Sequence, residues 1–282
     1  MLAYRHAFHA GNHADVLKHV VLVQLMHHLA RKDKGVRVVD THAGAGMYAL
    51  DSPQAQKKGE YLQGIARLWA ARDPPQAVAD YLEQLRRVNA DGVLRHYPGS
   101  PLLVHAMLRP QDQLRLFELH PADHQALQAL LGAARGVEVR QADGFALLKG
   151  QLPPPTRRAL VLVDPSYEGH ADYGRVLAAL GDALRRFAQG VYMVWYPVVT
   201  KPGAAALVQG LKALAPQGWL HARLHVQRPD EQGFGLLGSG IVVLNPPHTL
   251  HARLRAALPW LAQALGQHAQ AGHLLELHEA TA

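Results

Sequence analysis

Residues 159–167 read ALVLVDPSY, a run of strand-forming residues that ends in an acid, a proline, a serine and a tyrosine. A strand without polar side chains is typical of a parallel sheet that is covered on both faces. In an open parallel sheet, ligands bind beyond the carboxyl ends of the strands. The stretch therefore predicts that Asp164, Pro165 and Tyr167 lie at the mouth of a ligand site.

Similar strand-forming runs recur along the chain, and helical patterns lie between most of them. The other runs cover residues 36–40, 113–120, 137–144, 190–197, 219–227 and 239–247. Alternating strands and helices predict an α/β, Rossmann-like fold with a seven-stranded, mostly parallel, doubly wound sheet. The last two runs have no strong helical pattern between them, which favours an antiparallel pair.

Two helical regions accompany this predicted sheet. Apolar residues recur at helical spacing over residues 14–30, and Asn12 precedes them as a candidate N-cap. Residues 51–97 contain two further helical patterns that are separated by the breaker RDPP. We expect a single domain over residues 1–282, in which residues 51–97 form a small helical insertion subdomain after the first strand.

Composition limits the class of protein. Apolar residues make up 49% of the 282 residues, and the absence of cysteine excludes disulfides and thiolate metal ligands. No stretch approaches the ~18 unbroken apolar residues that a membrane span needs, and the start lacks an apolar signal core. We therefore expect a soluble cytoplasmic protein. The net charge of +7 favours a polyanionic partner, although ordinary surface charge explains it equally well.

Acidic residues stand at the ends of the first three predicted strands. Asp40 opens the motif DTHAGAG and can accept hydrogen bonds from a ligand, while Gly44 lets the backbone approach that ligand closely. Glu118 is placed to accept from both hydroxyls of a ribose, and Asp143, beside Gly144, from an adenine amino group. Helix N-capping is the alternative for Asp143. The three acids together favour a nucleoside pocket.

The fourth acid, Asp164, follows the strand quoted first. The exocyclic amine of a base is a poor nucleophile, so a site that alkylates it must accept its hydrogen bonds and hold it in line. The Asp164 carboxylate and the Pro165 carbonyl supply two acceptors, and Tyr167 supplies a ring for stacking a flipped base. A strand-ending turn with an exposed tyrosine is the simpler alternative for these residues taken alone.

The order of these motifs resembles the amino-group methyltransferases that use S-adenosylmethionine, whose signature is [DN]-P-P-[FY]. The opening YRHAFHAGNHADVLKH, with DTHAGAG, GEYLQGIARLW, HYPGSP, ADGF, DPSYE and WYPVV, is more specific. It resembles the bacterial 23S ribosomal RNA adenine-N6 methyltransferases of the J type. The resemblance runs from residue 1 to about residue 260.

The resemblance implies a class I methyltransferase that modifies the N6 amino group of a specific adenine in 23S ribosomal RNA. It also implies that the enzyme is monomeric, needs no metal, and acts on RNA that is protein-free or partly assembled. The cofactor-binding residues expected from the motifs and the resemblance are His19, Asp40, His42, Gly44, Ser100, Glu118, Asp143, Gly144 and Asp164.

The resemblance assigns the substrate side of the site as well. It implies that Asp164 is catalytic, with Pro165 and Tyr167 beside it, and that Tyr4 contacts the substrate or helps to gate the site. His6 and Lys18 match the same N-terminal motif and are expected to bind the substrate too. One position departs from the family, because Ser166 stands where the signature has a second proline. This departure loosens the expectation about rate and target, but both acceptors for the amine are retained.

Three other functions stay open from the sequence. A DNA adenine-N6 methyltransferase would use the same chemistry, and Ser166 leaves room for an inactive RNA-binding assembly factor. A nicotinamide-dependent oxidoreductase is the weakest, because the GxGxxG fingerprint is incomplete. His9, His13 and His19 lack a partnered acid or cysteine motif, so no metal site is expected.

Basic residues also gather in the predicted insertion, where aromatic residues between them could stack bases. With Tyr4, Arg5 and Lys18, they are expected to form an RNA-facing surface. The basic residues of the insertion are Lys57, Lys58, Arg67, Arg72, Arg86, Arg87 and Arg95.

Overall fold

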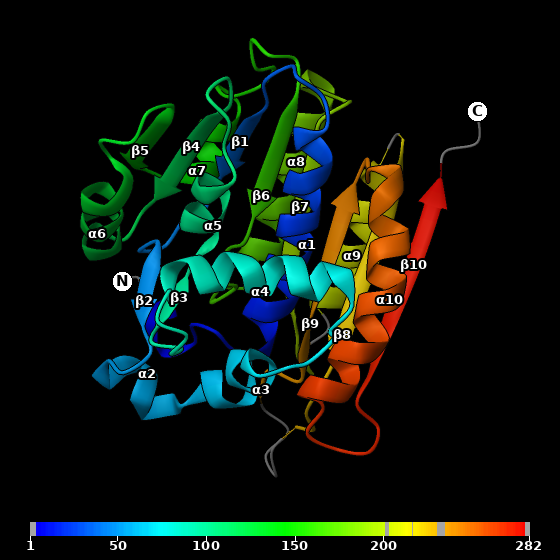
Figure 1. Cartoon of the computed structure of the whole chain (residues 1–282). Coiled ribbons are helices and arrows are strands. Elements are labelled where there is room, and N and C mark those ends of the chain that lie inside the picture. Colours follow the sequence, from blue (N-terminus) through cyan, green and yellow to red (C-terminus); the bar gives the residue numbers. More distant parts are fainter. Residues whose placement is uncertain (1–3, 201–202, 216, 230–234, 280–282) are drawn as a thin grey trace.

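The computed structural model describes residues 4–200, 203–215, 217–229 and 235–279 (Figure 1), so both ends of the predicted domain lie outside the described residues. Its centre is an eight-stranded sheet in the order β10-β8-β9-β7-β6-β1-β4-β5. The strands are Arg37–Asp40 (β1), Gln113–Glu118 (β4), Val137–Gln141 (β5), Ala159–Val163 (β6), Val191–Val198 (β7), Gly218–His225 (β8), Gly238–Leu244 (β9) and Gly272–Glu279 (β10).

The sheet is mostly parallel, which confirms the predicted fold class. Strands β5, β4, β1, β6 and β7 pair in parallel, while β9 is antiparallel to both β7 and β8. The last two predicted runs therefore do form an antiparallel pair. The predicted count of seven strands was wrong, because β10 adds an eighth strand antiparallel to β8. This edge strand is mostly unburied and mixes His and Glu with Leu, so it carries little strand signal.

Both faces of the sheet are covered by helices. Along β6, Leu160 and Leu162 enter one apolar cluster and Val161 and Val163 enter the other, because successive side chains of a strand point to opposite faces. The first cluster includes side chains of α1 (His13–Ala30), α4 (Gln76–Val88), α5 (Ser100–Ala106), α6 (Pro121–Leu131) and α10 (His248–Leu265). The second includes side chains of α7 (Gly144–Leu148), α8 (Ala171–Arg186) and α9 (Gly203–Leu214).

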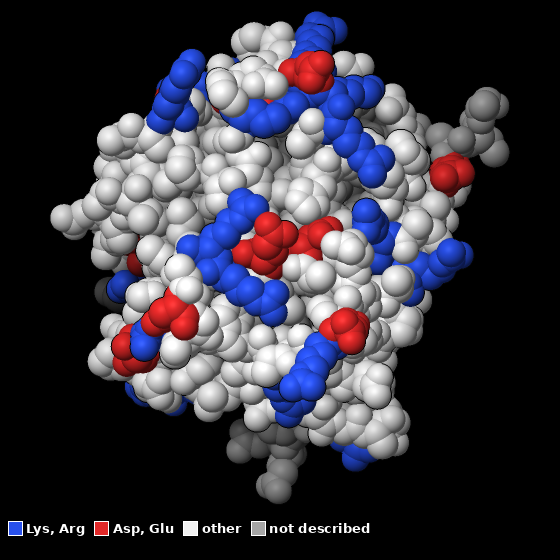
Figure 2. All heavy atoms as spheres, in the orientation of Figure 1, with Lys and Arg blue, Asp and Glu red and all other residues white. Residues whose placement is uncertain are grey.

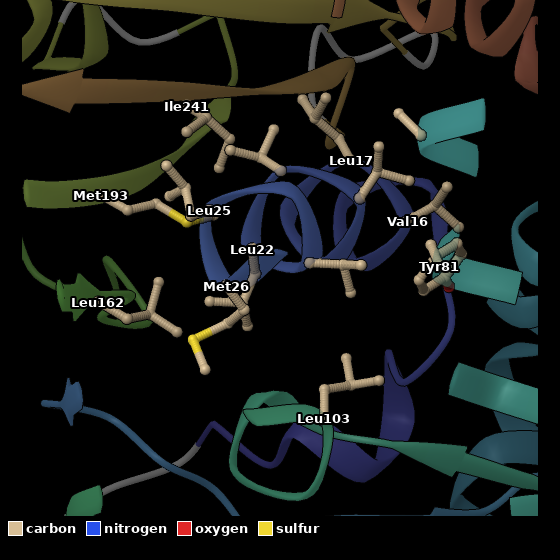
Figure 3. Close-up of a cluster of buried hydrophobic side chains, with 14 of the residues drawn as sticks. Val16, Leu17, Leu22, Leu25, Met26, Tyr81, Leu103, Leu162, Met193 and Ile241 are labelled. Carbon is tan, nitrogen blue, oxygen red and sulfur yellow. The ribbon is translucent and has the colours of Figure 1, made fainter. Parts of the chain in front are cut away.

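Helix α1 lies inside the molecule rather than on its surface. It contacts β7 and β9 of the sheet together with α4, α5 and α10. Leu22 and Leu25 are fully buried, and in Figure 3 the side chains around α1 meet residues of the sheet and of the neighbouring helices. The Oδ1 of Asn12 accepts from the backbone N–H groups of Ala14 and Asp15, as the predicted N-cap requires. Because α1 has no face that is mainly polar, it is suited to an interior position of this kind.

Residues between β1 and β4 form a strand pair and several short helices. Strands β2 (Met47–Ala49) and β3 (His96–Pro98) are antiparallel, a pair that the sequence did not predict because each is so short. Between them lie α2 (Pro53–Lys58), η2 (Glu60–Gln63), α3 (Ile65–Trp69) and α4. The N-terminal η1 (His6–Phe8) packs against α2. No helix in the described ranges is long and apolar enough to cross a membrane.

Candidate active site

A cavity of about 430 Å³ opens beyond the carboxyl ends of the parallel strands, where the sequence places the strand-end acids. Cavities of this size hold small organic ligands. Most of the predicted site residues line it, namely Tyr4, His6, Lys18, His19, His42, Gly44, Ser100, Glu118, Asp143, Gly144, Asp164 and Pro165. Asp40 and Tyr167 do not line it, although each contacts a residue that does.

Asp40 lies beneath the cavity floor and is only 1% exposed. Its carboxylate accepts from the Ser100 hydroxyl at 2.6 Å and from the backbone N–H of His42 at 3.2 Å. Burial raises the pKa of Asp40 to about 6, although the hydrogen bond from Ser100 acts in the opposite direction. Asp40 therefore orients Ser100 and the turn after β1, and these two present polar groups to the cavity.

The turn after β1 brings backbone close to the cavity. Gly44 has a φ of +65°, and a Cβ atom there would lie 2.3 Å from the Tyr48 hydroxyl oxygen. Its N–H donates to Oε2 of Glu118 at 2.7 Å, and the N–H of His120 donates to Oε1 at 2.7 Å. These two bonds orient the carboxylate, and each oxygen keeps a lone pair for a ligand hydroxyl.

Asp143 joins α7 to α8. Its Oδ1 accepts from the N–H of Phe145, so it caps α7 as the simpler prediction had it. Its Oδ2 is 2.5 Å from the guanidinium of Arg175, which also lies over the Phe145 ring at 4.8 Å. His42 meets the same ring edge-on, and burial lowers the pKa of His42 to about 4, so the imidazole is neutral. The sequence contained no signal for Arg175, because a charged residue early in a helix is common.

His19 lines the cavity and has a buried ring nitrogen without a partner among the described residues. It is 1% exposed, and burial lowers its pKa to about 3, so its ring is neutral. Its Nδ1 is 2.8 Å from the Tyr97 hydroxyl, which in turn bonds the Tyr81 hydroxyl at 3.0 Å. Nε2 has no partner in the described part of the chain. A buried polar atom that lines a cavity and lacks a partner is suited to a ligand.

Asp164 is held by Lys18 of α1. The Lys18 ammonium donates to Oδ2 of Asp164 at 2.5 Å and lies 2.9 Å from Oδ1 of Asp15. Burial raises the pKa of Asp164, and the ammonium opposes that rise. Both carboxylates raise the pKa of Lys18 well above its ordinary value despite burial, so this lysine is charged. Lys18 is thus engaged inside the protein, which does not fit its predicted place on an RNA-facing surface.

The turn after Asp164 turns the tyrosine away from the cavity. Tyr167 has a φ of +51°, a strained conformation that is typical of functional turns. Its hydroxyl donates to the Trp195 carbonyl at 2.7 Å, and its ring packs against Tyr173 and Trp195. Pro165, Ser166 and Trp195 line the cavity instead. The indole N–H of Trp195 is buried without a partner among the described residues, so this side chain is a candidate that the motif WYPVV could have suggested.

The N-terminal histidines have protein partners. His9 Nδ1 lies 3.0 Å from both carboxylate oxygens of Glu60. His6 bonds Asp15 through Nε2 at 2.8 Å and Tyr4 through Nδ1 at 2.8 Å. Within the described ranges, no three or more His, Asp or Glu side chains are grouped so that they could hold a metal ion.

The basic side chains within residues 51–97 differ in whether they are paired with an acidic side chain. Arg87 pairs with Glu83, and Arg95 with Asp91, while Lys57 and Lys58 are exposed on α2. Figure 2 shows Lys and Arg side chains along the top edge and across the centre of the face, with Asp and Glu among the central ones. Arg87 and Arg95 are therefore partly neutralised, and the exposed lysines of α2 lie next to η1, with the Lys58 ammonium 3.9 Å from Oε1 of Glu60.

Comparisons with known proteins agree with this arrangement. A family model described as "Ribosomal RNA large subunit methyltransferase D, RlmJ" matches residues 33–277. "Ribosomal RNA large subunit methyltransferase J" of Escherichia coli K12 is 44% identical over 265 residues, which cover 94% of each chain. The protein of the same name from Haemophilus influenzae is 44% identical over 266 residues, again with 94% of each chain covered. A crystal structure of a protein from Legionella pneumophila is 32% identical, with a TM-score of 0.87 over 97% of this chain and 99% of that one.

Proposed function

The chain belongs to the RlmJ family of ribosomal RNA large subunit methyltransferases, and we propose that Asp164 directs its methyl transfer to the N6 amine of one adenine in large-subunit RNA. The protein is an S-adenosylmethionine-dependent methyltransferase with the class I fold. The residues at the cavity fit that cofactor. The unpartnered Nε2 of His19 and the close backbone approach at Gly44 are features that a bound nucleoside would explain.

We propose that the cavity has a cofactor side and a substrate side. The cofactor side would be formed by residues after β1, β4 and β5, with Glu118 toward the ribose hydroxyls and Asp143 with Phe145 toward the adenine. The cofactor supplies an electrophilic methyl group on a sulfonium, which is already an excellent leaving group. The protein therefore needs to orient the acceptor and exclude water, more than to activate the donor.

The observation that carries the proposal is the environment of Asp164. The carboxylate sits at the cavity wall with Oδ2 held by Lys18, and no described residue donates to Oδ1. In the proposed reaction, Oδ1 and the Pro165 carbonyl accept the two amine hydrogens and hold the nitrogen lone pair toward the methyl carbon. Nitrogen gains the methyl group and then loses one proton. Asp164 is placed to receive that proton after transfer.

We propose that the RNA substrate is protein-free or an early assembly intermediate and that a monomer acts on it in the cytoplasm. The side chain of Asp164 is only 15% exposed, so the target adenine has to leave its stack to reach it. This is easier before ribosomal proteins have fixed the RNA. Residues 51–97 would act as an insertion within a single methyltransferase domain, with Lys57 and Lys58 toward the phosphates.

The test is transfer of labelled methyl from S-adenosylmethionine to protein-free 23S RNA, assembled large subunits and genomic DNA. We expect N6-methyladenosine in protein-free RNA, and a loss of at least ~100-fold in rate for Asp164→Ala. Asp182→Ala is the matched control, because it removes a carboxylate of α8 that does not line the cavity. Label in DNA alone would contradict the proposed substrate. Cofactor binding without transfer to any nucleic acid would contradict the proposed reaction.

A further inference from the structure

A continuous chain of hydrogen bonds and ion pairs links the N-terminal segment to Asp164. The Tyr4 hydroxyl bonds Nδ1 of His6 at 2.8 Å, and Nε2 of His6 bonds Oδ2 of Asp15 at 2.8 Å. Oδ1 of Asp15 lies 2.9 Å from the Lys18 ammonium, which lies 2.5 Å from Oδ2 of Asp164. Asp15 is the middle member, and the sequence patterns did not single it out.

Asp15 is saturated by groups of the protein itself. Its carboxylate is 2% exposed and accepts from His6, from the backbone N–H of Gly11 at 2.9 Å and from Lys18. Despite burial, the charges of His6 and Lys18 hold the pKa of Asp15 well below its usual range, so it is ionised. A buried carboxylate with three donors has little capacity left for a ligand. Asp15 can affect the reaction only through the groups that it holds.

We propose that Asp15 is a positioning residue for methyl transfer: it shares the Lys18 ammonium with Asp164, and it ties the segment that carries Tyr4 to that ion pair. This inference rests on the proposed function, because it assigns a role toward the amine acceptor of that reaction.

The sharing matters because one ammonium faces two carboxylates. If Asp15 were neutral, the charge of Lys18 would be balanced by Asp164 alone, and that pair would tighten. Asp164 would then be a weaker acceptor for the adenine amine. With Asp15 present, the ammonium fixes the orientation of Asp164 through Oδ2 and leaves Oδ1 basic enough to accept.

The proposed role of Asp15 can be tested through the pKa of Asp164, which should shift in opposite directions when Asp15 or Lys18 is neutralised. The groups that face Asp164 are Lys18, Asp15 and His6 from α1 and the N-terminal segment, Asp40 from β1, and the hydroxyls of Tyr4 and Tyr167. Within this set, the charge of Lys18 lowers the pKa of Asp164 and the charge of Asp15 raises it. Neutralising Asp15 should therefore lower the pKa of Asp164, and neutralising Lys18 should raise it.

The experiment compares Asp15→Asn with Lys18→Met in the full-length protein. Single-turnover methyl transfer to protein-free 23S RNA is measured over a pH series, with S-adenosylhomocysteine affinity measured by calorimetry. We expect each variant to transfer at least ~10-fold more slowly than the wild type. The acid limb of the rate profile should move to lower pH in Asp15→Asn and to higher pH in Lys18→Met. Cofactor affinity should stay within about threefold of the wild type in both.

A second variant keeps the inference testable if Asp15→Asn does not fold. His6→Gln breaks the link to the N-terminal segment but keeps both carboxylates and Lys18. We expect KM for RNA to rise, and the acid limb to move to higher pH, because the charge of His6 lowers the pKa of Asp164.

The outcomes separate the two proposals. A wild type that transfers methyl to no RNA overturns the proposed function, and this inference falls with it. An active wild type with variants whose acid limbs do not move, or move in the same direction for Asp15→Asn and Lys18→Met, overturns only the inference. In that case, Asp15 would merely stabilise the fold.

Discussion

Lys18 and Asp164 are separated by 146 positions in the sequence, yet the ammonium of one lies 2.5 Å from the carboxylate of the other. Lys18 projects from a helix that is buried on nearly all sides, while Asp164 ends a fully buried strand. The Lys18 side chain is 7% exposed and the Asp164 side chain 15% exposed, so the ion pair between them is largely shielded from solvent. This contact is the reason why the interior helix α1 matters to the chemistry as well as to the core.

Truncation of a buried leucine of α1 should be costly. Leu22 is fully buried among side chains of α1 and its neighbours (Figure 3). We expect Leu22→Ala to lower the free energy of unfolding by about 2–5 kcal/mol, because the rigid surroundings leave a cavity. Leu62→Ala removes the same atoms from a side chain that is 53% exposed, and should change stability by less than about 0.5 kcal/mol. Equal losses in urea titrations of the two variants would contradict this account.

The glycine turn after β1 should be needed for cofactor affinity. Gly44→Ala places a Cβ atom against the Tyr48 hydroxyl and strains a positive φ, in a turn that lines the cavity. We expect S-adenosylhomocysteine to bind at least ~10-fold more weakly in calorimetry, a change of about 1.4 kcal/mol.

The matched control for that turn is Gly92→Ala. Gly92 also has a positive φ, of +80°, but a Cβ atom there would meet nothing within 4 Å. Its backbone strain of about 1–2 kcal/mol should lower stability without changing cofactor affinity. If both variants bind the cofactor as the wild type does, the turn does not contact it.

Buried His13 should make stability depend on pH. Burial lowers its pKa from 6.5 to about 4. Between these pH values, the His13 imidazole is therefore protonated in the unfolded chain but stays neutral in the folded protein. The contribution of neutral His13 to the free energy of unfolding is fully present above pH 6.5 and is lost as the pH falls toward 4. One pKa unit corresponds to about 1.36 kcal/mol. Between pH 6.5 and pH 4, the free energy of unfolding of the wild type should therefore fall by up to ~3 kcal/mol more than that of His13→Gln.

Chemical denaturation at several pH values measures this difference between wild type and His13→Gln. The exposed His273 supplies the control, and His273→Gln should follow the wild type across the range. A constant difference between the wild type and His13→Gln from pH 6.5 to pH 4 would show that folding does not lower the pKa of His13.

The exposed lysines of α2 should contribute to RNA affinity. Replacement of Lys57 and Lys58 by Gln should weaken binding of protein-free RNA and lower the slope of log affinity against log salt by about 1.4 for single-stranded contacts. Arg185→Gln with Arg186→Gln removes the same charge from α8 and should leave the slope nearly unchanged. Equal slopes in filter-binding titrations of the two double variants would reject α2 as the RNA-facing element.

Local patterns of the sequence predicted seven of the eight strands of the sheet and most of the acids that line the cavity. The apolar runs and the helical spacing between them predicted the mostly parallel sheet, because a strand covered on both faces has to be apolar throughout. Glu118, Asp143 and Asp164 reach one cavity because the carboxyl ends of parallel strands meet at one edge of the sheet, whereas Asp40 lies just outside it. The edge strand β10 escaped prediction because a half-exposed strand needs no such pattern.

Contacts between distant segments were decided only by the tertiary structure. The Asp40 carboxylate holds Ser100, the Tyr167 hydroxyl bonds Trp195, and Lys18, itself paired with Asp15, reaches Asp164 from the far end of the chain. Residue type and spacing indicate which kinds of group a side chain can bond. They do not indicate which donor or acceptor the packing of the protein brings within 3 Å of it. That choice depends on the close packing of α1 against the sheet, which involves the whole molecule.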